Sequence, residues 1–218
     1  MIEKTFIRVW LGNGVKPPIF DQWWDELGRM HPGFKMLTVS DREAVRMLPK
    51  ELFKIWDEAG SLSQQSDIIR YLLLANEGGV YMDCDVMPLK PFTQLLEDPR
   101  PFAGKRSSKS FEAAVIGCPK GHPAAMELLK RFPKFFWEQK TRSSALTGPV
   151  FLSSVWFGRS DVRHLPTKTF YPYNGFHPPK RHEKIAIFEK RDFPEEMIAA
   201  HFSNMVWGGK PKKKLGDW

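Results

Sequence analysis

The chain has 218 residues and is 42% hydrophobic, which suffices for one buried core and excludes a disordered or low-complexity protein. Its 33 Lys and Arg residues against 25 Asp and Glu give a net charge of +8, yet these cations are spread along the chain, which argues against a dedicated nucleic-acid binder. Two cysteines provide no disulfide framework, and the longest uncharged apolar runs fall far short of the ~20 residues of a membrane span.

Strand-like and helix-like segments alternate along the chain, a pattern typical of an α/β fold. Strand-like runs are predicted at residues 6–11, 35–39, 80–84 and 113–117. Helix-like runs are predicted at residues 20–30, 42–48, 64–76 and 124–136. No linker or internal repeat separates these segments. The sequence therefore predicts one domain over residues 1–209, followed by a short basic tail over residues 210–218.

The helix predicted at residues 64–76 carries two charged residues beside an apolar stripe. The stripe consists of Ile69, Leu72, Leu73 and Asn76. Asp67 and Arg70 lie outside the stripe and three residues apart, so they are neighbours on one helical face. They can present a carboxylate and a guanidinium to a common ligand. The plainer alternative is a surface ion pair, which contributes little stability.

A pair of carboxylates follows the third strand-like run. With a period of two, Asp83 and Asp85 point to one side of the strand and Cys84 points to the other. Carboxylates this close repel each other, and one pKa rises unless a cation or a shared proton lies between them. Oxygen ligands suit Mg²⁺ or Mn²⁺, which complete their coordination with water and substrate phosphates. The pair therefore predicts a metal-diphosphate site, although Asp-x-Asp by itself is a weak motif.

The context of this pair is more specific than the pair itself. Residues 66–92 carry a Ser-Asp-x-x-Arg-Tyr helix, a Gly-Gly turn, Tyr81 two residues before the first carboxylate, and a Leu-Lys-Pro-Phe exit. This combination resembles the sugar-nucleotide-binding signature of glycosyltransferase family 32, which includes initiating mannosyltransferases and capsule enzymes and is related to the clostridial glucosylating toxins. The resemblance implies a GT-A-like single domain, in which helices flank a central, mostly parallel mixed sheet.

Looser similarity to the family extends from about residue 5 to about residue 208. The matching segments are Phe6 to Gly12, Ala114 to Gly117, Gly121 to Pro123, Thr147 to Pro149, Ala200 with His201, and Trp207. In this resemblance the first segment is the opening strand beside the nucleotide base, and the last two close the site.

The resemblance also implies roles for the acidic motif and the helix before it. Asp85 binds the metal directly, and Asp83 contacts the ribose and the water shell of the metal. Asp67 and Arg70 hold the sugar hydroxyls, a task that suits the fork of an arginine. These four residues are the expected catalytic set, with Mn²⁺ or Mg²⁺ as the cofactor.

Four further residues are expected to complete the site. Tyr81 would bind the diphosphate or ribose, and Trp10 would stack on the base; the alternatives are a half-buried strand tyrosine and a core aromatic residue. His201 would be a third metal ligand, with a satisfied buried histidine as its alternative. Trp207 would cover the donor on a loop hinged at the two glycines that follow it, and so exclude water.

The implied function is metal-dependent transfer of a hexose from a UDP- or GDP-linked nucleotide-sugar to a glycan, lipid-linked or protein acceptor, with retention at the anomeric carbon. Two other classes stay open: a Mg-dependent phosphatase of the haloacid dehalogenase type, which also uses Asp-x-Asp, and a non-catalytic basic binding protein. The first residues lack a secretion signal, which favours a cytoplasmic location. The tail at residues 210–218 is expected to be a solvated end or to contact the anionic inner face of a membrane.

Overall fold

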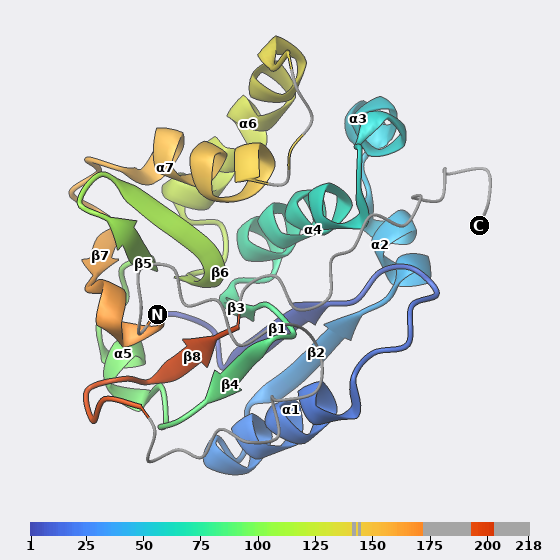
Figure 1. Cartoon of the computed structure of the whole chain (residues 1–218). Coiled ribbons are helices and arrows are strands. Elements are labelled where there is room, and N and C mark those ends of the chain that lie inside the picture. Colours follow the sequence, from blue (N-terminus) through green and yellow to red (C-terminus); the bar gives the residue numbers. More distant parts are fainter. Residues whose placement is uncertain (141–142, 144, 172–192, 203–218) are drawn as a thin grey trace.

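The computed structural model describes residues 1–140, 143, 145–171 and 193–202 of the chain. Its centre is a six-stranded sheet in the order β2-β1-β3-β6-β5-β7 (Figure 1). The strands are β1 (Thr5–Val9), β2 (Lys35–Val39), β3 (Gly79–Met82), β5 (Phe102–Ser107), β6 (Ser110–Cys118) and β7 (Arg163–Leu165). The β3–β6 and β6–β5 pairs are antiparallel, and the other three pairs are parallel. The expected mixed, mostly parallel sheet is therefore confirmed.

Helices cover both faces of the sheet, as expected for this fold class. They are α1 (Pro18–Met30), α2 (Asp41–Met47), α3 (Phe53–Glu58), α4 (Leu62–Asn76), α5 (Thr93–Glu97), α6 (Pro123–Glu138) and α7 (Phe151–Trp156), with helical turns η1 (Lys50–Leu52), η2 (Leu146–Val150) and η3 (Thr167–Thr169). In Figure 1, α1 lies on one side of the sheet, while α4, α6 and α7 lie on the other. No helix among the described residues is long and apolar enough to cross a bilayer.

Alternation along the central strands divides the core into two parts. Phe6 on β1 packs into the cluster on the α1 side, and its neighbour Ile7 packs into the cluster formed with α4, α6 and α7. On β3, Val80 and Met82 join the first cluster, whereas Tyr81 joins the second. A strand buried on both faces is read as a nearly continuous apolar run, which is why the sequence identified β1 and β3.

Helix α4 differs from the expected amphipathic helix because its side chains are buried on every face from Gln64 to Ala75. The helix packs against β1 and β3 on one side and against α6 and η2 on others. Asp67 and Arg70 are neighbours on one face of the helix, as expected, with Arg70 Nη1 2.7 Å from Asp67 Oδ1. They are only 2% and 5% exposed, so this face is buried. The alternative of a surface ion pair is therefore wrong.

The acidic motif lies in a turn and not in a strand. The expected strand over residues 80–84 ends at Met82, and the backbone N–H of Val86 donates to the Asp83 carbonyl at 3.2 Å. A second, two-stranded sheet follows, in which β4 (Val86–Pro88) pairs antiparallel with β8 (Ala199–His201). This pairing sets Val86 opposite His201. The far end of the chain is thereby brought to the acidic motif.

Candidate metal and donor site

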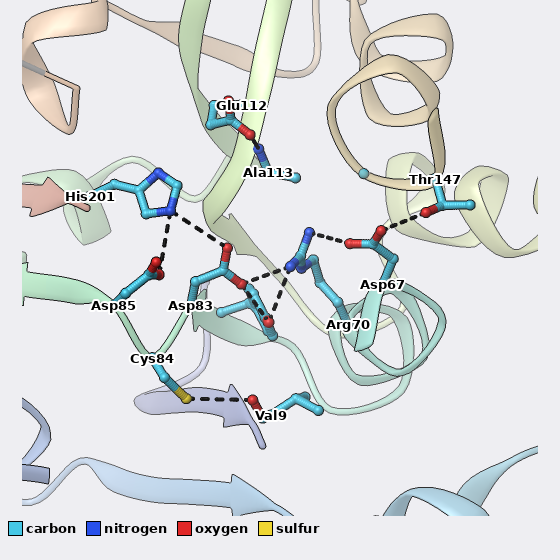
Figure 2. A network of polar contacts seen from close by, with 12 residues as sticks. Val9, Asp67, Arg70, Asp83, Cys84, Asp85, Glu112, Ala113, Thr147 and His201 are labelled. Carbon is cyan, nitrogen blue, oxygen red and sulfur yellow. Dashed lines mark hydrogen bonds and ion pairs between the residues drawn. The ribbon is translucent and has the colours of Figure 1, made fainter. Parts of the chain in front are cut away.

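The turn between β3 and β4 directs its side chains to opposite sides. The Asp83 backbone N–H donates to the Ala114 carbonyl at 2.8 Å, which fixes the start of the turn on β6. The Cys84 thiol points away from the two carboxylates and donates to the Val9 carbonyl at 3.4 Å (Figure 2). Burial raises the pKa of Cys84 to about 12, so this thiol is uncharged at neutral pH. The expected opposition of Cys84 and the carboxylates is confirmed, although a turn produces it.

His201 lies against both carboxylates. Its Nε2 is 3.4 Å from Asp85 Oδ1 and 4.0 Å from Asp83 Oδ2 (Figure 2). One ligand atom from each of the three residues lies within 4.8 Å of the other two. The three residues that were predicted as metal ligands thus lie together in the structure, although two come from a turn and the third from a strand that is distant in sequence.

Charge dominates the behaviour of this cluster. Burial by itself lowers the pKa of His201, but the charges of Asp85, Asp83 and Glu112 outweigh burial and raise that pKa to about 9. Burial raises the pKa of Asp83, and the charge of Asp85 adds to the rise while Arg70 opposes it. Without a cation, the imidazolium of His201 is therefore the positive partner of the two carboxylates at neutral pH.

The donor set fits a divalent cation. Asp85 Oδ1 is buried and has no hydrogen-bond donor within the described part of the chain; its contact with His201 Nε2, at 3.4 Å, is an ion pair. Asp67, Asp83 and Asp85 carry three negative charges when ionised, and Arg70 and the imidazolium of His201 supply two positive charges, so one negative charge stays uncompensated. Buried charge of this kind is costly unless it is paired or coordinates a metal. Two carboxylates and an imidazole are ligands that suit such an ion.

A buried chain of polar contacts links this cluster to α4. Arg70 donates from Nη2 to Asp83 Oδ1 at 2.7 Å, and its Nη1 lies 2.7 Å from Asp67 Oδ1. The Tyr81 hydroxyl also donates to Asp83 Oδ1, at 2.8 Å. One oxygen of Asp83 is thus held by two donors, while the other faces His201. The arginine and tyrosine therefore fix the direction of the Asp83 carboxylate.

The other end of this chain of contacts is closed by the segment at residues 147–149. The Thr147 hydroxyl donates to Asp67 Oδ2 at 2.7 Å. The Tyr71 hydroxyl donates to the Thr147 carbonyl at 2.8 Å, which holds the segment against α4. At Gly148 an added Cβ would lie 3.3 Å from Asp67 Oδ1, so the backbone approaches the carboxylate closely. Burial raises the pKa of Asp67 to about 7, although Arg70 and Thr147 oppose that rise.

The residues of this site lie within a region shared with known proteins. Residues 22–101 match the glycosyltransferase sugar-binding region containing the DXD motif, a stretch that includes Asp67, Arg70, Asp83 and Asp85. Over this stretch the chain is similar to that glycosyltransferase family. The resemblance to glycosyltransferases that was predicted from residues 66–92 is therefore confirmed.

Two similar proteins come from yeasts. The chain is 29% identical over 168 residues to inositol phosphoceramide mannosyltransferase 3 of Schizosaccharomyces pombe, which covers 73% of this chain and 46% of that protein. It is 29% identical over 133 residues to mannosyl phosphorylinositol ceramide synthase SUR1 of Saccharomyces cerevisiae, which covers 58% and 35%. The chain thus spans less than half the length of these relatives.

A solved structure shares the fold of this chain. The PaToxG glycosyltransferase superposes with a TM-score of 0.54 at 18% sequence identity, over 71% of this chain and 68% of that one. At this identity the likeness concerns the fold alone. It confirms the GT-A-like architecture that the sequence predicted.

The three aromatic residues that were predicted to contact the donor have different surroundings. Tyr81 is 1% exposed, and its hydroxyl serves Asp83. Trp10 is half-buried, donates from Nε1 to the Gly14 carbonyl at 3.2 Å and packs edge-on against Phe20. Trp207 lies outside the described residues. Contact of these side chains with a nucleotide-sugar stays a prediction, as does contact of Asp67 and Arg70 with sugar hydroxyls.

The sequence analysis did not assign one acidic residue that lies near this site. Glu112 on β6 is close enough for its charge to raise the pKa values of both Asp67 and His201. Its carboxylate accepts from the Ala113 backbone N–H at 3.1 Å, on the side of β6 shown in Figure 2. The only local signal was a charged residue within an otherwise apolar strand. Its proximity depends on how β6 pairs with β3.

Proposed function

We propose that this chain is a divalent-metal-dependent hexosyltransferase, in which Asp83, Asp85 and His201 hold the cation that binds the diphosphate of a nucleotide-sugar. The observation that carries this proposal is the convergence of three ligand atoms within 4.8 Å of one another, next to a buried carboxylate oxygen without a hydrogen-bond donor. The family match over residues 22–101 supports the choice of a sugar nucleotide as the ligand.

The residues of the chain contribute mainly position and charge. Arg70 and Tyr81 hold one oxygen of Asp83, so the direction of the other oxygen is set before a ligand arrives. When bound, the cation supplies electrostatic stabilisation of the negative charge that develops on the departing nucleoside diphosphate. Mn²⁺ suits two carboxylates and an imidazole better than Mg²⁺, which prefers an all-oxygen shell.

Mannose is the sugar that we propose first. Both yeast relatives carry mannosyl transfer in their names, and both names contain an inositol phosphoceramide or a phosphorylinositol ceramide. We therefore propose a mannose-linked donor and an acceptor hydroxyl carried by a lipid. The leaving nucleotide is left to the test, because pocket contacts distinguish nucleotides and sugars by only a few side chains.

A donor panel tests the proposal. The chain is incubated with GDP-mannose, UDP-glucose, UDP-galactose or UDP-N-acetylglucosamine, with Mn²⁺ or with EDTA, and the released nucleoside diphosphate is measured. We expect slow release from one donor, only with Mn²⁺, and faster release with an inositol phosphoceramide acceptor. Release of inorganic phosphate from a phosphomonoester would instead support the phosphatase class.

Matched variants connect activity to the cluster. Asp85→Asn removes a proposed ligand without changing side-chain size, and Asp25→Asn makes the same change at an exposed position of α1. We expect the first variant to lose metal-dependent release and the second to keep it. The proposal is overturned if no donor releases nucleotide and Mn²⁺ does not change the melting temperature of the wild-type chain.

A further inference from the structure

Two aromatic side chains are exposed at one edge of the molecule. Phe53 at the start of α3 is 39% exposed, and Trp137 near the end of α6 is 44% exposed. The Lys54 ammonium lies 5.2 Å from the centroid of the Trp137 ring and so connects the two helices. Figure 1 shows α3 and the end of α6 projecting beyond α4. We call this surface, residues 50–58 and 130–140, the α3–α6 edge.

The outer face of α6 combines apolar and positively charged side chains in one stripe. Met126, Lys130, Lys134 and Trp137 follow one another at spacings of four, four and three, and all four are exposed. This spacing places them on a single face of the helix. The opposite face is buried in the core. The helix is therefore amphipathic, and these four side chains are exposed on its outer face.

Positive charge predominates over the whole α3–α6 edge. The exposed cations are Lys50, Lys54, Lys130, Arg131, Lys134 and Lys140. The exposed carboxylates are Glu51, Glu58 and Glu138. Six cations minus three carboxylates leave an excess of three positive charges around the two aromatic rings. This combination is complementary to an anionic surface into which an aromatic ring can insert.

The α3–α6 edge is also connected to the candidate site. The Gln64 side chain, in the first turn of α4, donates to the Ser143 carbonyl at 3.1 Å, just beyond the end of α6. Asp67 follows one turn later on the same helix and accepts from Thr147. The chain segment that leaves the edge therefore leads directly to the segment that closes the polar network.

We propose that the α3–α6 edge docks the protein on an anionic lipid bilayer, with Trp137 and Phe53 at the headgroup level and the lysines against lipid phosphates. Aromatic rings and long cationic side chains are the residues that bind at this interface. The attraction is screened by salt, as expected for exposed charges. Docking itself is independent of catalysis; only its use to reach a lipid-borne acceptor rests on the proposed function.

Vesicle sedimentation tests the proposal on the full chain. Vesicles of phosphatidylcholine alone are compared with vesicles that also contain phosphatidylserine, at low and at physiological salt. We expect binding to the anionic vesicles only, with weaker binding as salt rises. Equal binding to both vesicle types would overturn the proposal, as would absence of binding to the anionic vesicles at low salt.

Variants locate the surface. Lys130→Gln/Lys134→Gln/Lys140→Gln and Phe53→Ala/Trp137→Ala should each weaken vesicle binding by about ten-fold or more. Lys35→Gln/Lys109→Gln/Lys120→Gln makes the same charge change at other exposed positions, and Phe157→Ala removes another 39% exposed aromatic ring; both should bind within about two-fold of wild type. Unchanged melting temperatures show that the edge variants are folded.

A third variant separates the edge from the basic tail. Lys212→Gln/Lys213→Gln/Lys214→Gln removes the charge of the tail and leaves the edge intact. If this variant loses vesicle binding while both edge variants keep it, the proposal is overturned in favour of the tail. Vesicle binding without nucleotide release in any donor assay would leave the docking proposal supported and would count against the proposed function alone.

Discussion

The two ends of the buried polar network differ in how completely their carboxylates are paired. At the Asp67 end, Oδ1 is paired with Arg70 and Oδ2 accepts from Thr147, each at 2.7 Å. At the Asp85 end, Oδ1 is buried and accepts no hydrogen bond from the described residues. Arg70 connects the two ends through Asp83. The difference indicates that one end is built to stay fixed and the other to take a ligand.

The largest expected effect comes from breaking the connection between the two ends. Arg70→Leu leaves Asp67 and Asp83 buried without their shared cation, which should lower the free energy of unfolding by about 3–5 kcal/mol. Urea denaturation followed by circular dichroism measures the change. Arg100→Leu, at an exposed ion pair, should leave the midpoint nearly unchanged. Equal urea midpoints for the two variants would contradict a structural role for the Arg70 guanidinium.

The second largest effect is expected at the Asp85 end, which we call the unpaired end because Asp85 Oδ1 has no hydrogen-bond donor among the described residues. Asp85→Asn should weaken Mn²⁺ binding, measured by calorimetry, by more than about a hundred-fold, because loss of a direct ligand exceeds the 10–100-fold cost of outer-shell partners. In the metal-free protein it should cost less stability than Asp67→Asn, because Asp85 Oδ1 accepts no hydrogen bond from the described residues whereas both oxygens of Asp67 are paired. Asp67→Asn should behave in the opposite way. If it abolishes Mn²⁺ binding as strongly as Asp85→Asn, the contrast between the two ends is wrong.

The third effect sharpens the description of the paired end. Thr147→Val keeps the shape of the side chain but removes the hydroxyl that donates to Asp67, which should cost about 1–3 kcal/mol of stability. The pKa of Asp67, already about 7, should rise further because the lost donor stabilised the charged form. Carbon-detected NMR titration measures that pKa. Thr93→Val, at an exposed position of α5, is the matched control and should change neither quantity.

The smallest effect is a dependence on pH at the unpaired end. A metal ligand must be the neutral imidazole, and the pKa of His201 without metal is about 9, so Mn²⁺ must displace a proton. Apparent Mn²⁺ affinity should therefore rise with pH by up to about ten-fold per unit below pH 9. His201→Gln should flatten this slope. A slope that is identical in the variant would exclude His201 as the titrating ligand.

The same pKa predicts how the metal-free protein responds to pH. Because the folded pKa of His201 lies above its ordinary value of 6.5, its pairing with the carboxylates adds stability that is full below pH 6.5 and is lost as pH rises through 9. His31 provides an internal contrast in an NMR titration, since burial lowers its pKa and its Nε2 accepts from the Phe92 backbone N–H. His201 should therefore titrate well above His31.

Much of the fold could be read from local sequence. The strands at residues 35–39 and 113–117 and the helices at residues 20–30 and 124–136 lie where their apolar patterns predicted them. The strand β7 and the helices α3, α5 and α7 were not predicted, since segments this short carry too few residues for a clear period. The strand β5 was not predicted because its second half is polar and partly exposed, which interrupts the apolar pattern. The burial of α4 was missed because its polar residues are satisfied inside the core, at Gln64, Gln65 and Asp67.

Part of the candidate site could likewise be predicted from local sequence, and part could not. The spacing of Asp83 and Asp85 placed two carboxylates together, since residues this near in sequence cannot be far apart in space. The apolar residues before His201 predicted a strand, but they did not predict which strand it pairs with. Only the pairing of β8 with β4 brings the imidazole to the carboxylates, and only the position of η2 brings Thr147 to Asp67.

The sequence by itself determined the alternation of strands and helices, the acidic pair and the resemblance of residues 22–101 to a glycosyltransferase family, because these depend on near neighbours in the chain. The tertiary structure alone decided which carboxylate oxygens are paired, that Asp67 and Arg70 are buried, and that the pKa of His201 is raised. Hydrogen bonding and desolvation are set by segments far apart in the sequence, which meet only when the chain folds.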